Sequence, residues 1–157
     1  MTTGDEVQLV IFRVGSQAFA LNIFQVERVL RYQEATPIPG APPFLEGVFA
    51  YGDRTIPLVD LRKRLGEPAR VRDETRVIVL GQHDGGVAIV VDAVLAVRKV
   101  AADEIVPPSP ILRGLAAECV QATVAAEGRT IVLLAAARLL TTTEQIALRD
   151  LLAEAPG

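Results

Sequence analysis

The sequence of 157 residues has very few of the side chains on which most catalytic and metal sites depend. It contains one histidine (His83), one cysteine (Cys119), one asparagine, two serines and no tryptophan. A single cysteine excludes an intramolecular disulfide and a thiolate cage for zinc. The only imidazole lies in a His-Asp-Gly-Gly stretch typical of an exposed hairpin turn, and Cys119 opens an apolar stretch typical of a buried thiol. The sequence therefore predicts a protein that is not an enzyme and uses no metal or cofactor.

Charge and hydropathy exclude two further classes. Sixteen basic and nineteen acidic residues give a net charge of −3, and seven aromatics stand mostly in apolar segments, which argues against a nucleic-acid-binding protein. No glycine-rich phosphate loop is present. The start MTTGDEVQ is acidic where a secretion signal would be basic, and no apolar run approaches the roughly 20 residues of a membrane span. With only a single cysteine, these features predict a cytoplasmic protein without direct membrane insertion.

Segments rich in β-branched residues, separated by short turns, dominate the remaining sequence. Each pair of such segments predicts a β-hairpin. Proline-rich connections at 35–43 and 107–110 exclude regular helices there. The predicted hairpins pair 7–14 with 18–21, 47–51 with 54–59, 76–80 with 87–91, and 120–126 with 129–134.

Three helices are expected between or after these hairpins. Asn22, with Gln25 as its capping-box partner, precedes helically spaced apolar residues at 23–31. Asp60 is expected to cap a short helix at 61–65 that Gly66 ends. A capping pattern that starts at Thr142 predicts an amphipathic helix over 142–155, which we expect to dock on its own barrels.

The order of elements occurs twice along the chain. RTIPLVDLRKRL at 54–65 matches RTIVLLAAARLL at 129–140 at five of twelve positions, with an offset of 75. Val10-Ile11 corresponds to Val77-Ile78, and Asp92 follows the second repeat's hairpin where Asn22 follows the first. Each unit of about 70 residues suits a small five-stranded barrel with too little core to stand alone. The repeat therefore predicts two small barrels that pack together.

Several sequence blocks, taken in order, resemble the CheW family of bacterial chemotaxis coupling proteins. They are FRVGSQAFALNIFQVERVL, PGAPPFLEGV, IPLVDLRKRLG, RVIVL with GGVAIVVDAVLAVRKV, EIVPPSP and EGRTIVLLAAARLL. The resemblance implies an all-β fold with short helices: two SH3-like five-stranded barrels around a shared core, plus a C-terminal helix. We expect one CheW-like domain over 1–157, with a first barrel at 15–75, a second at 76–140, and residues 7–14 exchanged or packed between them.

The same resemblance implies a non-catalytic adaptor in a two-component chemosensory pathway. Its expected partners are the cytoplasmic tip of a chemoreceptor (a methyl-accepting chemotaxis protein) and the regulatory domain of a CheA-type histidine kinase. Other CheW-like proteins are further expected partners, in arrays that are membrane-associated or cytoplasmic. The receptor tip is expected to dock in an apolar groove between the barrels.

The contact positions that the resemblance assigns lie in three segments. Ordinary alternatives are a core role for the valines, a helix cap for Asp92, and a special backbone conformation for Gly47. The assigned residues are Val26, Arg28, Gly47, Tyr51, Gly52, Asp53, Val90, Val91 and Asp92.

The sequence departs from the family pattern within these segments. Gly52 stands where the family has the arginine of Asn-x-Arg-Gly, and Arg28 stands where it has a glutamate. Loss of a guanidinium or reversal of a charge changes which partner fits. A divergent regulator that binds one partner only and modulates or caps the array therefore remains an alternative. A more remote alternative is a small-ligand-binding β-barrel with a polar pocket around Asp60, Asp92 or His83.

Overall fold

The computed structural model describes residues 5–81, 86–107, 119–126 and 128–139. Within these ranges the chain is almost entirely β-structure, and none of its helices is long and apolar enough to cross a membrane. The predicted turn at His83 and the predicted helix over 142–155 lie outside the described residues. The elements are β1 (Glu6–Val14), β2 (Gln17–Asn22), the 3-10 turn η1 (Ile23–Gln25), β3 (Val26–Arg31), β4 (Leu45–Tyr51), β5 (Arg54–Asp60), α1 (Leu61–Arg64), β6 (Arg76–Leu80), β7 (Val87–Val91), β8 (Ala93–Ala101), η2 (Ala102–Glu104), β9 (Ile105–Val106), β10 (Val120–Ala126), β11 (Arg129–Leu134) and η3 (Ala136–Arg138).

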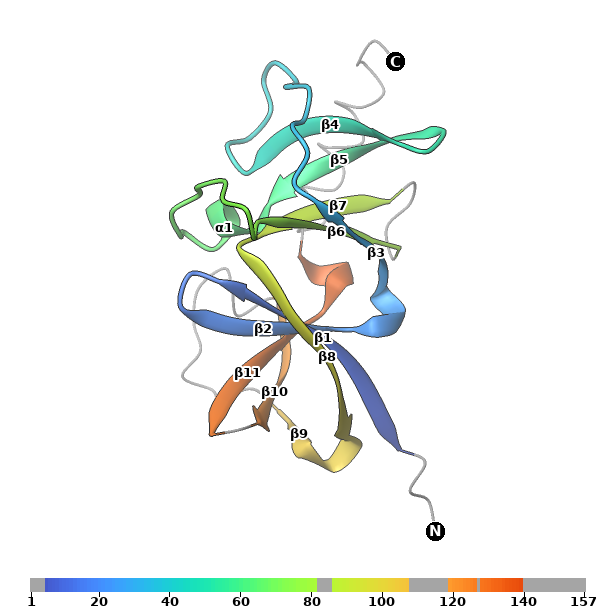
Figure 1. The fold of residues 1–157 in the computed structure, drawn as a ribbon, viewed down its shortest axis with the longest axis vertical. Coiled ribbons are helices and arrows are strands. Elements are labelled where there is room, and N and C mark those ends of the chain that lie inside the picture. The colour runs from blue at the N-terminus through green and yellow to red at the C-terminus, as the bar shows by residue number, and fades with distance from the viewer. Residues whose placement is uncertain (1–4, 82–85, 108–118, 127, 140–157) are drawn as a thin grey trace.

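The strands form two sheets, one above the other in Figure 1. Sheet A has the order β8-β1-β2-β11-β10-β9, and sheet B has the order β3-β6-β7-β5-β4. In each sheet two antiparallel hairpins are joined by one parallel pair, β2 with β11 in sheet A and β5 with β7 in sheet B. The two sheets therefore share one topology, as the sequence repeat predicts, with the two-residue strand β9 added to sheet A.

Each sheet takes its first hairpin from the opposite repeat. The hairpin β1-β2 joins β8, β10 and β11 in sheet A, whereas the hairpin β6-β7 joins β3, β4 and β5 in sheet B. The division into a barrel at 15–75 and a barrel at 76–140 therefore does not match the composition of the sheets. Residues 7–14 are part of this exchange, and residues 76–91 are exchanged as well. The first strand of each exchanged hairpin pairs with a strand of the other repeat. Strand β1 pairs with β8, and strand β6 pairs with β3.

The alternation of side chains along central strands divides the core into three parts. Successive residues of β6 point to opposite sides, so Val77 and Val79 fill a core within sheet B while Ile78 and Leu80 enter a core shared by both sheets. A third core lies within sheet A. The thiol of Cys119 is buried in the shared core, as the sequence predicts. The shared core explains why two units of this size remain together.

The prediction of a helix over 23–31 is wrong. Asn22 does cap, since its side-chain oxygen accepts a hydrogen bond from the Phe24 amide at 3.0 Å, but the helical structure is one 3-10 turn. From Val26 onward the chain is strand β3, paired antiparallel with β6. Backbone pairing with a distant strand thus overrides a local helical spacing that included the β-branched Val26 and Val29. By contrast, Asp60 caps α1 as predicted, accepting from the Arg62 amide at 3.0 Å.

Candidate interaction surface

Three side chains from separate strands meet where the β4-β5 hairpin approaches the start of β3. Arg54 Nη2 donates to Glu27 Oε2 at 2.6 Å, and the Arg54 guanidinium lies 5.1 Å from the centre of the Tyr51 ring. Tyr51 also interacts with the Glu27 carboxylate and lowers its pKa. We call Glu27, Tyr51 and Arg54 the edge cluster. It combines a carboxylate, a guanidinium and a ring on a surface open to solvent.

Local backbone geometry creates this cluster. The pairing of β3 with β6 shifts register between Val26 and Arg28, so Glu27 is the extra residue of a β-bulge. A bulge redirects a side chain that regular alternation would place elsewhere. The β4-β5 turn contains Gly52 at φ 61° and the exposed Asp53, and it brings Arg54 directly opposite Tyr51. The predicted contact residues Arg28, Gly52 and Asp53 therefore surround the cluster on an exposed edge.

The cluster favours the ionised form of its carboxylate. The interaction with Tyr51 lowers the pKa of Glu27 below its ordinary value; burial opposes this shift, and Arg54 and Arg28 add to it. Burial, followed by the contact with Glu27, raises the pKa of Tyr51. Because the pKa of Glu27 is depressed, the ion pair is intact at neutral pH and is lost only as the pH falls through that lowered value.

Replacing Tyr51 with phenylalanine is expected to raise the pKa of Glu27 toward its ordinary value, because the strongest of the interactions that lower it is removed. A carbon-detected NMR titration of the Glu27 carboxylate measures this shift. Tyr32→Phe is the matched control, since the groups that shift the pKa of Tyr32 do not include Glu27. An unchanged pKa of Glu27 in the Tyr51 variant would contradict the assigned interaction.

Other predicted contact residues are buried or partly buried. Val90 and Val91 are fully buried in β7, Val90 in the core of sheet B and Val91 in the shared core, and Val26 packs against the shared core. Gly47 is buried in β4 at φ 141°, and a Cβ there would lie 2.0 Å from the Thr36 carbonyl oxygen. These positions agree with the ordinary alternatives, a contact role for the four residues stays a prediction, and β7 belongs to the sheet formed mainly by the first repeat.

Asp92 joins a buried charge network and caps no helix, because β8 follows it directly. Its Oδ2 accepts from the Gly15 amide at 2.7 Å, and its Oδ1 accepts from Arg62 Nη1 at 3.2 Å. Arg62 also donates through Nε and Nη2 to both oxygens of Asp60, each at 3.0 Å. The side chains of Arg62 and Asp60 are 2% and 1% exposed. The network connects β5 and α1 of sheet B to the β1-β2 turn of sheet A.

Arg62 also holds the segment between α1 and β6. Its Nη1 donates to the Arg70 carbonyl oxygen at 2.7 Å. Burial disfavours the charge of Arg62, but Asp60 and Asp92 outweigh burial and raise the pKa of the guanidinium above its usual range. Arg62 therefore remains charged, and its donors are spread over two carboxylates and one carbonyl.

The structure adds three surface residues that the sequence interpretation did not select. Phe24 in η1 is 87% exposed, and Glu27 and Arg54 form the ion pair of the edge cluster. Phe24 lies outside the apolar spacing at 23, 26, 29 and 30, which was a signal for its exposure. The position of Glu27 depends on the bulge, and that of Arg54 on the turn, so residue spacing alone did not indicate them.

Comparisons with known proteins agree along most of the chain. A family model described as the CheW-like domain matches residues 8–144. The chemotaxis protein CheW of Rhizobium meliloti is 34% identical over 127 residues, which is 80% of this chain and 82% of that protein. The chemotaxis protein CheW of Klebsiella aerogenes is 32% identical over 150 residues, covering 95% of this chain and 89% of that protein.

A solved structure has a similar fold. The crystal structure of the scaffolding protein TtCheW from Thermoanaerobacter tengcongensis superposes with a TM-score of 0.80 at 26% identity, covering 88% of this chain and 94% of that chain. This similarity confirms the predicted all-β fold of two SH3-like barrels for the described residues. The strand exchange described above is therefore part of a fold that this scaffolding protein shares.

Proposed function

The chain belongs to the CheW family of chemotaxis coupling proteins, and on this basis we propose that it joins a chemoreceptor cytoplasmic tip to the regulatory domain of a CheA-type histidine kinase. It acts in the cytoplasm at chemosensory arrays, through protein surfaces and without catalysis or a cofactor. The match of the CheW-like domain model over residues 8–144 is the observation that carries this proposal.

The exposed edge between the sheets offers a surface of the required kind. η1 carries the chain from sheet A to sheet B, and its Phe24 is an exposed aromatic three residues before the ion-paired Glu27. Strands β3 and β8, which occupy equivalent edges of the two sheets, expose Val29 and the pair Leu95 and Val97. Exposed apolar side chains beside a polar rim are typical of protein contact sites.

The edge cluster bears on whether one partner or two are bound. The sequence predicts the loss of an arginine at Gly52 and a reversed charge at Arg28, which supports the alternative of a one-partner regulator. In the structure, Arg54 and Glu27 supply a guanidinium and a carboxylate close to those positions. The charges are displaced along the chain by one or two residues. This displacement favours an adaptor with altered partner preference over one that has lost a partner.

Calorimetric titration of the full chain with each cognate partner tests the proposal. An adaptor gives a saturable heat of binding in both titrations, with the receptor tip and with the kinase regulatory domain. A one-partner regulator gives a heat of binding with only one of them. Binding to neither partner would contradict the adaptor assignment.

Removing the charges of the edge cluster, with Glu27→Gln and Arg54→Gln together, is expected to weaken binding to at least one partner tenfold or more. A tenfold loss corresponds to about 1.4 kcal/mol. The free energy of unfolding should change little, because the pair is solvent-exposed. Calorimetry and denaturant unfolding measure the two quantities.

The control for this variant is the other exposed pair of sheet B, in which Lys63 Nζ donates to Glu46 Oε2 at 2.8 Å. Glu46→Gln with Lys63→Gln removes the same charges from a different part of the surface. Equal affinity losses in the two double variants would show that the edge cluster has no specific role in recognition.

A further inference from the structure

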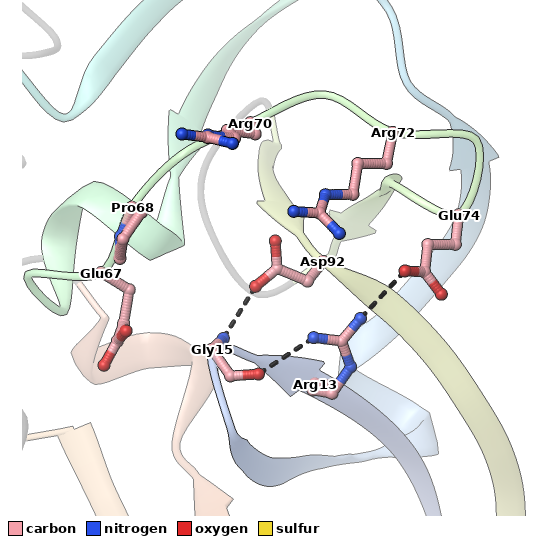
Figure 2. A pocket seen from close by; sticks show the side chains of 8 residues that line it. All are labelled: Arg13, Gly15, Glu67, Pro68, Arg70, Arg72, Glu74 and Asp92. Carbon is pink, nitrogen blue, oxygen red and sulfur yellow. Dashed lines mark hydrogen bonds and ion pairs between the residues drawn. The ribbon is translucent and has the colours of Figure 1, made fainter.

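A pocket of about 390 Å³, lined mostly by charged residues, lies beside the buried charge network. It opens where the segment between α1 and β6 passes the β1-β2 turn, so both sheets contribute to its walls (Figures 1 and 2). This volume is within the range of small-molecule sites. The lining residues are Arg13, Gly15, Glu67, Pro68, Arg70, Arg72, Glu74 and Asp92.

Two of the three lining arginines have unused donors. Among the described residues, the side chains of Arg70 and Arg72 take part in no hydrogen bond or ion pair. Figure 2 shows the Arg72 guanidinium directed inward beside Asp92, on the side of Asp92 away from the Arg13 guanidinium. Arg13 is held in place because it donates to the Gly15 carbonyl oxygen at 3.0 Å and to Glu74 at 3.1 Å. The pocket therefore presents guanidinium groups from two directions.

Two of the lining carboxylates already have cationic or N–H partners. Both oxygens of Asp92 accept hydrogen bonds, from Gly15 and Arg62, and one oxygen of Glu74 accepts from Arg13. Glu67 lies against Gly15 and, in Figure 2, points away from Arg72. Figure 2 shows the Arg70 guanidinium directed away from Arg72 and Asp92, so Arg72 supplies the guanidinium with free donors that faces the pocket and Arg70 lies at its rim.

We propose that this pocket binds a small oxyanion of the phosphate or phosphate-monoester class. The planar guanidinium presents paired donors that match phosphate oxygens, and two such groups suit a doubly charged ion. Fourteen of the sixteen basic residues in the sequence are arginines, and five of them fall within residues 62–76. The sequence interpretation weighed a pocket around Asp92 against the scarcity of His, Ser, Asn and Lys; arginine supplies the donors here. This site is separate from the edge cluster and extends the function beyond adaptor binding.

An ion in this pocket would connect the two sheets. Arg70 and Arg72 belong to the segment that leads into β6 of sheet B, whereas Arg13 and Gly15 belong to β1 and its turn in sheet A. A ligand that contacts both groups binds the folded state and therefore raises its stability as its concentration rises. The bound ion would thus act on the relative rigidity of the two barrels.

The test is an amide NMR titration of the full chain with sodium phosphate, compared with sodium chloride at equal ionic strength. We expect saturable shifts at Gly15, Arg72 and Asp92 with phosphate alone, accompanied by a higher melting temperature. Glycerol 3-phosphate and adenosine monophosphate distinguish the source: tighter binding of an ester identifies an organic phosphate, and equal binding identifies the free ion.

Arg70→Gln with Arg72→Gln should weaken phosphate binding at least tenfold, with amide shifts outside the pocket unchanged. Arg129→Gln, at an exposed arginine at the start of β11, is the control for loss of a positive charge elsewhere on the surface and should bind as the unmodified chain does. Shifts that chloride reproduces, or that do not saturate, would overturn the proposal. An equal loss in the Arg129 variant, or no loss in the double variant, would also overturn it.

Discussion

Replacing Arg62 with methionine is expected to lower the free energy of unfolding by about 3–5 kcal/mol. Methionine fills a similar volume but leaves Asp60 buried without a cationic partner, since Arg62 donates to both of its oxygens. The substitution also removes the donors to Asp92 and to the Arg70 carbonyl oxygen. Denaturant unfolding of both proteins at neutral pH measures the difference.

The neighbouring Lys63 provides the control for Arg62. Its partner Glu46 and its own side chain are partly exposed, so Lys63→Met should cost less than about 1 kcal/mol. Adding Asp60→Asn to Arg62→Met removes the unpaired buried charge and should restore part of the loss. Equal effects of the Arg62 and Lys63 variants would contradict the role assigned to the buried network.

Replacing Gly47 with alanine is expected to lower the free energy of unfolding by about 2–5 kcal/mol, from backbone strain and overpacking together. The φ of 141° is one that L side chains rarely adopt, and the added Cβ would lie 2.0 Å from the Thr36 carbonyl oxygen. Relief of this clash requires movement of a backbone bridge in which Thr36 and Val48 exchange two hydrogen bonds. The proline-rich connection would then separate from β4.

Gly52 distinguishes steric exclusion from a general effect of positive φ. Its φ is 61°, and a Cβ there would meet nothing within 4 Å. Gly52→Ala should therefore cost only about 1 kcal/mol, the ordinary penalty of the left-handed region. If unfolding shows the same loss for both glycines, close packing against Thr36 is not what requires Gly47.

The parts of the fold that the sequence predicts correctly are those set by local chemistry. Alternating β-branched residues and glycine turns identify all four hairpins, and Asp60 is recognisable as a cap because its side chain bonds two residues along the chain. Segment 23–31 fails because its strand pairing with β6 involves residues about 50 positions away. The spacing of apolar residues within a segment carries no information about a partner strand that far along the chain.

In the candidate site, too, local features can be predicted from the sequence and features set by distant strand pairing cannot. The resemblance selects the β4-β5 turn and the start of β3, and the charges that meet there are Glu27 and Arg54. Their meeting depends on a bulge in β3 and on the approach of β4-β5, both of which are set by pairing within sheet B. The resemblance assigns Val90 and Val91 to a contact surface; their burial depends on both faces of β7 being covered, which residue spacing does not reveal.

The spacing of residues in the sequence likewise does not reveal the buried network or the proposed phosphate pocket. Asp60 and Arg62 are two residues apart, but Asp92 is thirty residues from Arg62, at the junction of β7 in sheet B and β8 in sheet A. Exchange of the hairpins β1-β2 and β6-β7 between the repeats is what brings these groups together. A prediction based on two contiguous barrels would have placed them in separate units.

Kinase activity in a reconstituted mixture tests the central claim, that the chain couples a receptor to a kinase. The rate of kinase autophosphorylation is measured with the cognate receptor cytoplasmic fragment and the cognate CheA-type kinase, with and without the chain. An adaptor raises the rate in a receptor-dependent manner. No change, or a fall in the rate as the chain is added, would contradict coupling and indicate a protein that competes for one partner.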